Sequence, residues 1–552
     1  MLTQRIEYNA RVPQIALPND IEQLQRLVIE GRAQFAAALD AAHRQIEVAH
    51  REIQAAHSQI QDRDVLIEHL KLQIAKLRRQ QFGRSSEQID SQIAQLELTL
   101  EELETGAAEQ VVPLTAVPAP SARVKQQPVR RPLPEHLPRE DRLYTPACQC
   151  PSCGGALDVL GEDVSEVLEY VPSHFKVIRH VRPKLRCGVC ERIVQQPAPS
   201  RPIARGLAGP GLLAHVIVSK YADHLPLYRQ SAIFAREGID LDRSTLADWV
   251  GGVSALLDPL IGAIGHHVLA AEKLHADDTP VPVLSPGRGS TKTGRLWTYV
   301  RDDRPAGRDE PPAVLFQYSP DRKGERPCAH LANFTGVLQA DAYSGFNGLY
   351  DRAKDPLIEA ACWAHVRRKF YDLTLGGPAP LATEALTRIA VLYAIEAEIR
   401  GRHSTERAAV RQSRAGPHLD ALHVWFTQTL MQVSKKSALA NAIRYALSRW
   451  AALTRYRDDG RLEIDNIAAE RALRTVALGR KNYLFAGSDS GGERAAAMYS
   501  LLGTAKLNGI NPEAYLRHVL ERIADHPINR IDELLPWHVV KQLVQPADQV
   551  AG

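Results

Sequence analysis

Three acidic residues at separate points of the chain are candidates for metal chemistry. Asp277 lies in the strand-like stretch LHADDTPVPVL, Asp341 follows the strand-like stretch TGVLQA, and Glu470 lies in the helical stretch DNIAAERALR. In a mixed sheet the two strands would be neighbours, so both aspartates would meet at one edge and the helix would add Glu470. Three carboxylates around one point are costly unless cations neutralise them, and Mg²⁺ takes hard oxygen ligands.

Two Mg²⁺ or Mn²⁺ ions held by these residues would suit phosphodiester chemistry. Ions about 3.5 to 4 Å apart would activate a water or a 3′-hydroxyl and stabilise the leaving oxygen. Each acid also has a plainer interpretation: Asp278 rivals Asp277 on the alternating strand, Asp341 could form a turn before Gly345, and Glu470 could pair with a nearby arginine. Their order on strand, strand and helix favours the metal site.

The stretch around Glu470 supplies further candidates. Asp465 is the expected helix cap and Gly479 the expected stop. Asn466, one turn before Glu470, is a candidate for supporting the site or contacting DNA. Charge and position favour phosphate contacts by three basic residues of this stretch, which are Arg474, Arg480 and Lys481.

Two CxxC pairs predict a structural zinc site. The sequence CPSCGG supplies Cys150 and Cys153, and CGVC supplies Cys187 and Cys190. Four thiolates at this spacing form a closed tetrahedral Zn²⁺ site, whereas free cysteines or a redox pair explain the doubled spacing less well. Cys148 remains a spare thiol that could compete with Cys150.

The segments around the cysteines alternate like strands, which predicts a small zinc-binding ribbon with a basic strand. SEVLEYVP and KVIRHVRPKLRC have the period of two, and the second carries Lys184 and Arg186 as candidate DNA contacts.

The N-terminal part has isoleucine at 46, 53, 60, 67 and 74, a seven-residue period that predicts a coiled coil and self-association rather than a helix packed on its own domain.

Residues 205 to 255 have helical period and glycine punctuation. Three short helices are expected, and the last begins at DRST. This order fits a helix-turn-helix in which Arg243, Ser244 and Thr245, at the N-terminus of the recognition helix, would contact DNA. A plain helical connector has the same pattern.

The predicted fold is multidomain α/β, since three strands, a helix, a strand and then alternating helix and strand is the order of an RNase H-like domain. The expected parts are a coiled coil at 20–105, a proline-rich linker at 106–142, the zinc ribbon at 143–200, the helix-turn-helix at 205–255, an RNase H-like core at 270–370 and 459–510 with a helical insertion at 371–458, and a C-terminal helical tail at 511–552.

Composition limits the classes of protein. The 552 residues are 44% hydrophobic and 24% charged, with a net charge of +4, and no apolar run reaches the roughly 18 residues of a membrane span. The N-terminus lacks the apolar stretch of a signal peptide, and seven cysteines in so long a chain do not form a disulfide framework. We therefore expect a cytoplasmic protein with no membrane partner.

Several ordered motifs together resemble one family of proteins. They are KLRRQQFGRSSEQ, CPSCGG with CGVC, LYRQSAIFAREGIDLDRSTLADWV, ADDTPVPVL, LQADAYSGF, CWAHVRRKF, DNIAAERALR and LGRKNYLFAGSDSGGERAA. They cover nearly the whole chain, which resembles a transposase of the insertion-sequence sixty-six family, of the DDE type.

This resemblance implies a function and partners. Asp277, Asp341 and Glu470 match the family's acidic metal site, and the four cysteines at 150, 153, 187 and 190 match its zinc-binding domain. Such transposases bind terminal inverted repeats, assemble as multimers on paired DNA ends, cleave strands and join them to target DNA, often with two small accessory proteins. Cys362 and His365 of CWAH resemble a Cys-x-x-His signature of other DDE groups, with no assigned role. A zinc-containing DNA-binding regulator with a silent nuclease-like domain, or a junction-resolving nuclease, are the alternative functions.

Overall fold

The computed structural model describes residues 133–543, except 147–148, 172–173, 205, 285–290, 376, 481 and 483–484, together with residues 47, 54, 65–67, 69–70 and 73. The chain divides into two compact units, Met1–Gln73 and Ile74–Gly552. In the first unit, Ile67 and Leu70 are helical and buried. The rest of the expected coiled-coil seam lies outside the described residues, so the coiled coil stays a prediction.

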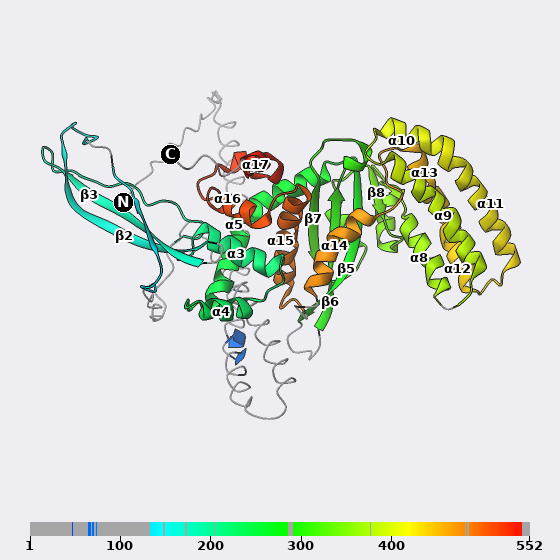
Figure 1. The fold of residues 1–552 in the computed structure, drawn as a ribbon, viewed down its shortest axis with the longest axis horizontal. Helices are drawn as coiled ribbons and strands as arrows, with labels where there is room; N and C mark the ends of the chain where they lie inside the picture. Colours follow the sequence, from blue (N-terminus) through cyan, green and yellow to red (C-terminus); the bar gives the residue numbers. More distant parts are fainter. Residues whose placement is uncertain are drawn as a thin grey trace, which may run out of the picture. The chain divides into compact units, whose positions relative to one another are not determined.

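A small twisted sheet carries the cysteine motifs. Its strands are β1 (Arg139–Leu143), β2 (Leu157–Val171), β3 (His174–Cys187) and β4 (Ile193–Val194), in the order β1-β3-β2 with β4 paired to β3. β2 and β3 form a long antiparallel hairpin, drawn in cyan in Figure 1, and β1 runs parallel to β3. The expected linker at 106–142 therefore ends earlier than predicted, because Arg139 already pairs with Val177.

Three helices follow, as the punctuation predicted, but the third is not short. They are α3 (Pro210–Tyr221), α4 (Leu227–Arg236) and α5 (Arg243–Leu269). We expected this segment to end near residue 255, yet α5 continues for 27 residues through Pro259. Its apolar positions Leu257, Leu260 and Ile264 are fully buried against the large sheet and its helices, so tertiary packing extends the helix. Within the described residues, α5 is the one helix apolar and long enough to cross a membrane, but 56% of its apolar window is buried, as in a core helix.

The large sheet has five strands in the order β7-β6-β5-β8-β9. They are β5 (Lys273–Leu284), β6 (Thr291–Arg301), β7 (Ala313–Ser319), β8 (Val337–Ala340) and β9 (Ile358–Ala360). β5, β6 and β7 form an antiparallel meander, while β8 runs parallel to β5 and β9 parallel to β8. β5 and β8 are therefore neighbours, as the order of elements predicted.

Short elements connect these strands, and two helices after the insertion pack on the sheet. The connecting elements are η1 (Arg304–Ala306), α6 (Glu325–His330), η2 (Ser344–Phe346) and α7 (Asn347–Tyr350). α14 (Ile467–Gly479) packs on β5 and β6, and α15 (Asp489–Leu507) packs mainly on β7 (Figure 1). Beyond α14, Ala486 forms a parallel bridge with Val283, which closes the far end of β5.

A helical group with its own core lies between β9 and α14, coloured yellow-green to light orange in Figure 1. Its helices are α8 (Trp363–Thr374), α9 (Pro380–Ile399), α10 (Ser404–Val410), the π-helical turn η3 (Arg411–Ala415), α11 (Gly416–Gln432), α12 (Ala438–Leu447) and α13 (Trp450–Asp458). We expected the insertion to begin at 371, but Trp363, Val366 and Phe370 of α8 already belong to its core. The apolar face of α8 thus joins the insertion to the sheet.

The C-terminal segment packs on the main core. α16 (Pro512–Leu520), η4 (Ile528–Leu534) and α17 (Pro536–Leu543) contribute Tyr515, Leu516 and Val539, which are fully buried. α16 lies against α3, and Arg517 donates a hydrogen bond to the carbonyl of Tyr170 in β2. The segment therefore connects helix α3 and the small sheet with the core around the large sheet.

Candidate metal centres

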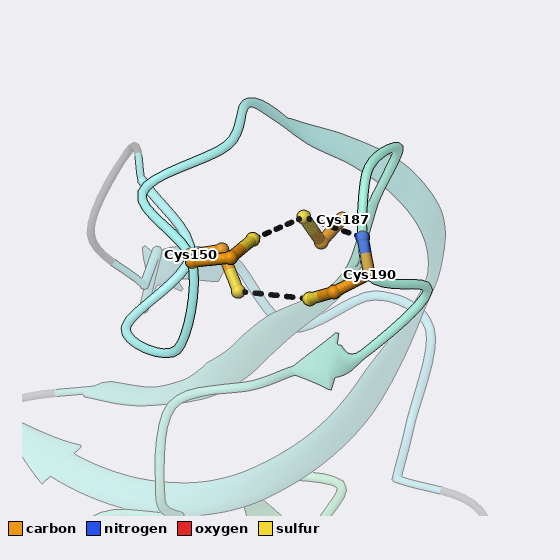
Figure 2. Close-up of side chains that lie close together, drawn as sticks. Cys150, Cys187 and Cys190 are labelled. Carbon is orange, nitrogen blue, oxygen red and sulfur yellow. Dashed lines mark hydrogen bonds between the residues drawn. The ribbon is translucent and has the colours of Figure 1, made fainter.

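The four predicted cysteines meet at the tip of the small sheet. Cys150 and Cys153 lie in the turn before β2, Cys187 ends β3, and Cys190 lies in the turn before β4. The sulfur atoms of Cys150 and Cys190 are 3.4 Å apart, and those of Cys153 and Cys187 are 3.5 Å apart. Figure 2 shows the side chains of Cys150, Cys187 and Cys190 facing one another from two opposed turns.

This geometry fits a tetrahedral metal. All four sulfur atoms lie within 4.8 Å of one another, and four sulfurs about 2.3 Å from one Zn²⁺ would lie about 3.8 Å apart. Hydrogen bonding by the Ser152 amide lowers the pKa of Cys150 to about 6, which favours the thiolate. Although the Gly155 amide opposes the change, the neighbouring thiols raise the pKa of Cys153 to about 12. A cation bound by the four sulfurs would stabilise their thiolate forms, and the cluster supports structural zinc.

The register of β5 and β8 brings two of the predicted acids together. Ala276 is the Cα partner of Ala340, so Asp277 and Asp341 each follow directly after the last pair of the ladder. Burial raises the pKa of Asp277 to about 7, and the negative charges of Asp341 and Glu470 contribute to that rise, although the Asp278 amide opposes it. The charges of Asp341 and of Glu470 thus each reach the carboxylate of Asp277.

The two neighbouring aspartates face opposite sides of β5. The Asp278 side chain is only 1% exposed, and its carboxylate accepts hydrogen bonds from Arg295 at 2.9 Å and from Arg322 at 2.7 Å. The Arg322 guanidinium also stacks over the Tyr343 ring, 4.0 Å from its centre. The charge of Asp278 is thus balanced by two arginines, whereas the charge of Asp341 acts on Asp277.

Glu470 does not form the helical ion pair that its spacing offered. It lies in the first turn of α14, and among the ion pairs of the described residues none joins it to Arg474. Instead, its Oε1 atom is 3.8 Å from Nδ1 of His365. Glu470 is 42% exposed, so its carboxylate is open to an incoming ion.

A buried hydrogen-bond network fixes the start of α14 against β5. Asn466 is fully buried; its amide nitrogen donates to the carbonyl of Ala276 at 2.7 Å, and its Oδ1 atom lies 3.1 Å from Nδ1 of His275. Burial and the nearby Lys273 lower the pKa of His275 to about 4, so the ring is neutral and Nδ1–H donates. Asn466 therefore positions the helix beside Asp277, and the expectation that it contacts DNA is wrong. Asn466 is also the residue at the helix cap, while Asp465 accepts a hydrogen bond from the Ile467 amide.

The predicted basic residues have different environments. Arg474 is exposed on α14, whereas Arg480 donates a hydrogen bond to the carbonyl of Pro280 at 2.8 Å. Arg186 is exposed on β3, but Lys184 already pairs with Asp163 at 2.6 Å. Lys481 lies outside the described residues.

The three residues predicted to contact DNA from the third helix lie at the start of α5. Arg243, Ser244 and Thr245 form its first turn and are half-buried, after the cap residue Asp242. Cys148, the spare thiol, is not among the described residues.

Sequence reasoning missed two features of this region. Arg295 and Arg322 balance Asp278, and Arg449 of the helical insertion donates to the carbonyl of Ala342, 3.5 Å away and next to Asp341. No local pattern marks these arginines, because each reaches its partner from another element of the fold. His275 lies two residues before Asp277 on the same strand face, which was the one available signal for it.

Comparison with protein-family models agrees with the motifs. The model described as Transposase IS66 family matches residues 205–494, and the IS66 C-terminal element matches 500–537. The zinc-finger binding domain of transposase IS66 matches 147–191, and the model described as Transposase C of IS166 homeodomain matches 69–142. The zinc-finger match contains all four clustered cysteines.

Several proteins of Sinorhizobium fredii are similar to this chain over most of its length. The uncharacterized protein y4hP is 46% identical over 479 residues, which are 83% of this chain and 86% of that protein. The uncharacterized protein y4qI is 40% identical over 84% of this chain and 87% of its own length. The uncharacterized protein y4jD is 42% identical over 74% and 81%, respectively.

Proposed function

Since this chain belongs to the IS66 family of transposases, we propose that it cleaves DNA at the ends of an insertion sequence and joins those ends to target DNA. The observation that carries the proposal is the pairing of β5 with β8, which sets Asp277 beside Asp341 and within electrostatic reach of Glu470. The strand order supports an RNase H-like core, with α8 to α13 as its helical insertion.

Asp277, Asp341 and Glu470 would hold two Mg²⁺ or Mn²⁺ ions. The fit rests on the chemistry of the donors: all three are carboxylates, and burial together with the charges of Asp341 and Glu470 raises the pKa of Asp277 to about 7. When bound, such ions activate the attacking hydroxyl and stabilise the leaving oxygen of a phosphodiester. Asn466 keeps α14 and Glu470 in place through its hydrogen bond to the strand that carries Asp277.

The surrounding arginines are suited to position the DNA backbone. Arg474 is exposed one turn after Glu470, and Arg322 is 38% exposed beside Tyr343. Phosphate contacts of this kind fix the position of the duplex without reading its sequence. We assign the same role to Arg480 and Lys481.

Recognition of the element ends is assigned to the N-terminal modules. The zinc ribbon with Arg186 and the start of α5 with Arg243, Ser244 and Thr245 are the proposed DNA-contacting parts. Self-association through the heptad region would bring two ends together, with the small accessory proteins of the element as further partners.

The test is cleavage and joining of labelled element-end DNA by the purified full-length protein in Mg²⁺ or Mn²⁺. Asp277→Ala, Asp341→Ala and Glu470→Gln are each expected to reduce both steps by at least about 10³-fold, since each removes a metal ligand. Asp309→Asn is the matched control, because Asp309 is an exposed aspartate in the loop between β6 and β7. Full joining activity in all three variants would refute the assignment, and cleavage without joining would favour a nuclease.

A further inference from the structure

A second group of metal-binding atoms adjoins Glu470. The Sγ atom of Cys362, a ring nitrogen of His365 and a carboxylate oxygen of Glu470 all lie within 4.8 Å of one another. Cys362 is the cap residue of α8 and His365 is the third residue of that helix, so both project from its first turn. This group is distinct from the carboxylate pair Asp277 and Asp341, since it combines a sulfur and a nitrogen donor with the oxygen of Glu470.

The group is held rigidly in place. The backbone N–H of Asn466 donates a hydrogen bond to Cys362 Sγ at 3.2 Å. The backbone N–H of Trp363 donates one to the carbonyl of Ile464 at 3.1 Å. These bonds fix the first turn of α8 against the segment that leads into α14. The first turn of α8, with Cys362 and His365, is therefore held beside the start of the helix that carries Glu470.

The cysteine and the histidine are suited to act as ligands. The amide-to-sulfur bond at Cys362 is of the same kind as the bond from the Cys190 amide to Cys187 Sγ in the zinc ribbon, at 3.5 Å. His365 Nδ1 is a buried atom with no hydrogen-bond partner among the described residues, and it lies 3.8 Å from Glu470 Oε1. Nitrogen and oxygen ligands about 2.0 to 2.1 Å from one tetrahedral ion would be about 3.4 Å apart, which a small rotation of the glutamate achieves.

We propose that Cys362, His365 and Glu470 form a site for a thiophilic divalent cation such as Zn²⁺, and that an ion bound there inhibits the enzyme by withdrawing Glu470 from the Mg²⁺ site. Sulfur and imidazole ligands select Zn²⁺ over Mg²⁺, which requires oxygen. Three protein ligands leave a fourth position open, unlike the closed four-cysteine site of the ribbon. The inhibitory part of this proposal rests on the function proposed above, whereas the existence of the site does not.

The first experiment counts metal ions in the full-length protein without DNA. Titration with Co²⁺, followed by sulfur-to-cobalt absorption, is expected to give two sites per chain in the wild type, the ribbon and the new site. Cys362→Ser and His365→Ala should each leave one. The matched control is Cys328→Ser, which removes a half-buried cysteine elsewhere in the domain and should retain two. The remaining ribbon absorption shows that each variant is folded.

One site in the wild type, or two in Cys362→Ser, would overturn the proposal.

The second experiment measures Mg²⁺-dependent cleavage with added Zn²⁺. At ten times its dissociation constant Zn²⁺ leaves about one tenth of the protein free, so the rate should fall about tenfold in the wild type and in Cys328→Ser. Cys362→Ser should show no such fall relative to its own zinc-free rate, and an equal fall would refute inhibition through this site. An absence of cleavage under all conditions would instead refute the proposed function, while the metal count still decides the existence of the site.

Discussion

Replacing Asp277 with asparagine is expected to stabilise the protein in the absence of metal. Burial and the nearby acids raise the pKa of this carboxyl from 3.8 to about 7, so its charged form is unfavourable in the folded state. At about 1.4 kcal/mol per pH unit, this corresponds to at most about 4 kcal/mol at pH 8. Since Asp277 is only partly buried, we expect Asp277→Asn to recover about 2 to 4 kcal/mol of unfolding free energy at pH 8.

The effect depends on pH in a defined direction. Between pH 3.8 and about 7 the folded protein keeps a proton on Asp277 that the unfolded chain has lost. The stabilisation from this proton is complete below pH 3.8 and is lost as the pH rises through 7. The advantage of Asp277→Asn over the wild type should therefore grow by about 2 to 3 kcal/mol between pH 5 and pH 8 and then level off.

The assay is urea unfolding followed by tryptophan fluorescence at several pH values, with and without Mg²⁺. Trp297 is fully buried and is the strand partner of Asp278, so it reports on this part of the sheet. Mg²⁺ should stabilise the wild type by binding the folded state and should stabilise Asp277→Asn much less. The substitution should therefore weaken metal binding and raise the unfolding free energy of the metal-free protein.

The neighbouring residue provides the control. Asp278→Asn should destabilise the protein by about 3 kcal/mol or more, because it leaves Arg295 and Arg322 without their buried partner. The reasoning would be refuted if Asp277→Asn were less stable than the wild type at pH 8, or if its advantage did not change between pH 5 and pH 8.

Three further changes test other parts of the structure. Cys187→Ser, or removal of zinc with a chelator, should unfold the ribbon without unfolding the large sheet, and circular dichroism together with protease mapping would detect this. Asn466→Ala should lower the unfolding free energy by about 2 to 3 kcal/mol, because it leaves the Ala276 carbonyl without its partner. The rate of DNA strand cleavage should also fall. Unchanged thermal stability would argue against a positioning role. Arg411→Met should cost about 3 to 5 kcal/mol in urea unfolding, since Arg411 is fully buried and contacts both carboxylate oxygens of Glu396 at 2.7 and 2.6 Å; a cost below about 1 kcal/mol would contradict this estimate.

Some of this protein could be predicted from local sequence alone. The two CxxC pairs predicted the four-cysteine cluster, because ligand spacing in a knuckle is a short-range property. The order of elements predicted that β5 and β8 are neighbours, whereas the preference for Asp277 over Asp278 from strand alternation stays a prediction. These are periodicities and connection rules that a linear chain already carries.

Other features depend on contacts between distant parts of the chain. Asn466 reaches the carbonyl of Ala276 across 190 positions, which converted a suspected DNA contact into a buried support. The continuation of α5 to Leu269 and the pairing of Arg139 with Val177 likewise required the surfaces against which they pack. Propensity and composition describe a segment by itself, and burial against another segment can override them.

The placement of Glu470 depends both on local sequence and on contacts between distant parts of the chain. The sequence by itself determined that an acid stands in the first turn of a helix, four residues before Arg474. Only the tertiary structure decided its neighbours: His365 at 3.8 Å on one side, and on the other Asp277, whose pKa its charge helps to raise. The physical reason is that electrostatic interaction depends on distance through space, and the fold brings together strands and helices that are far apart in the chain.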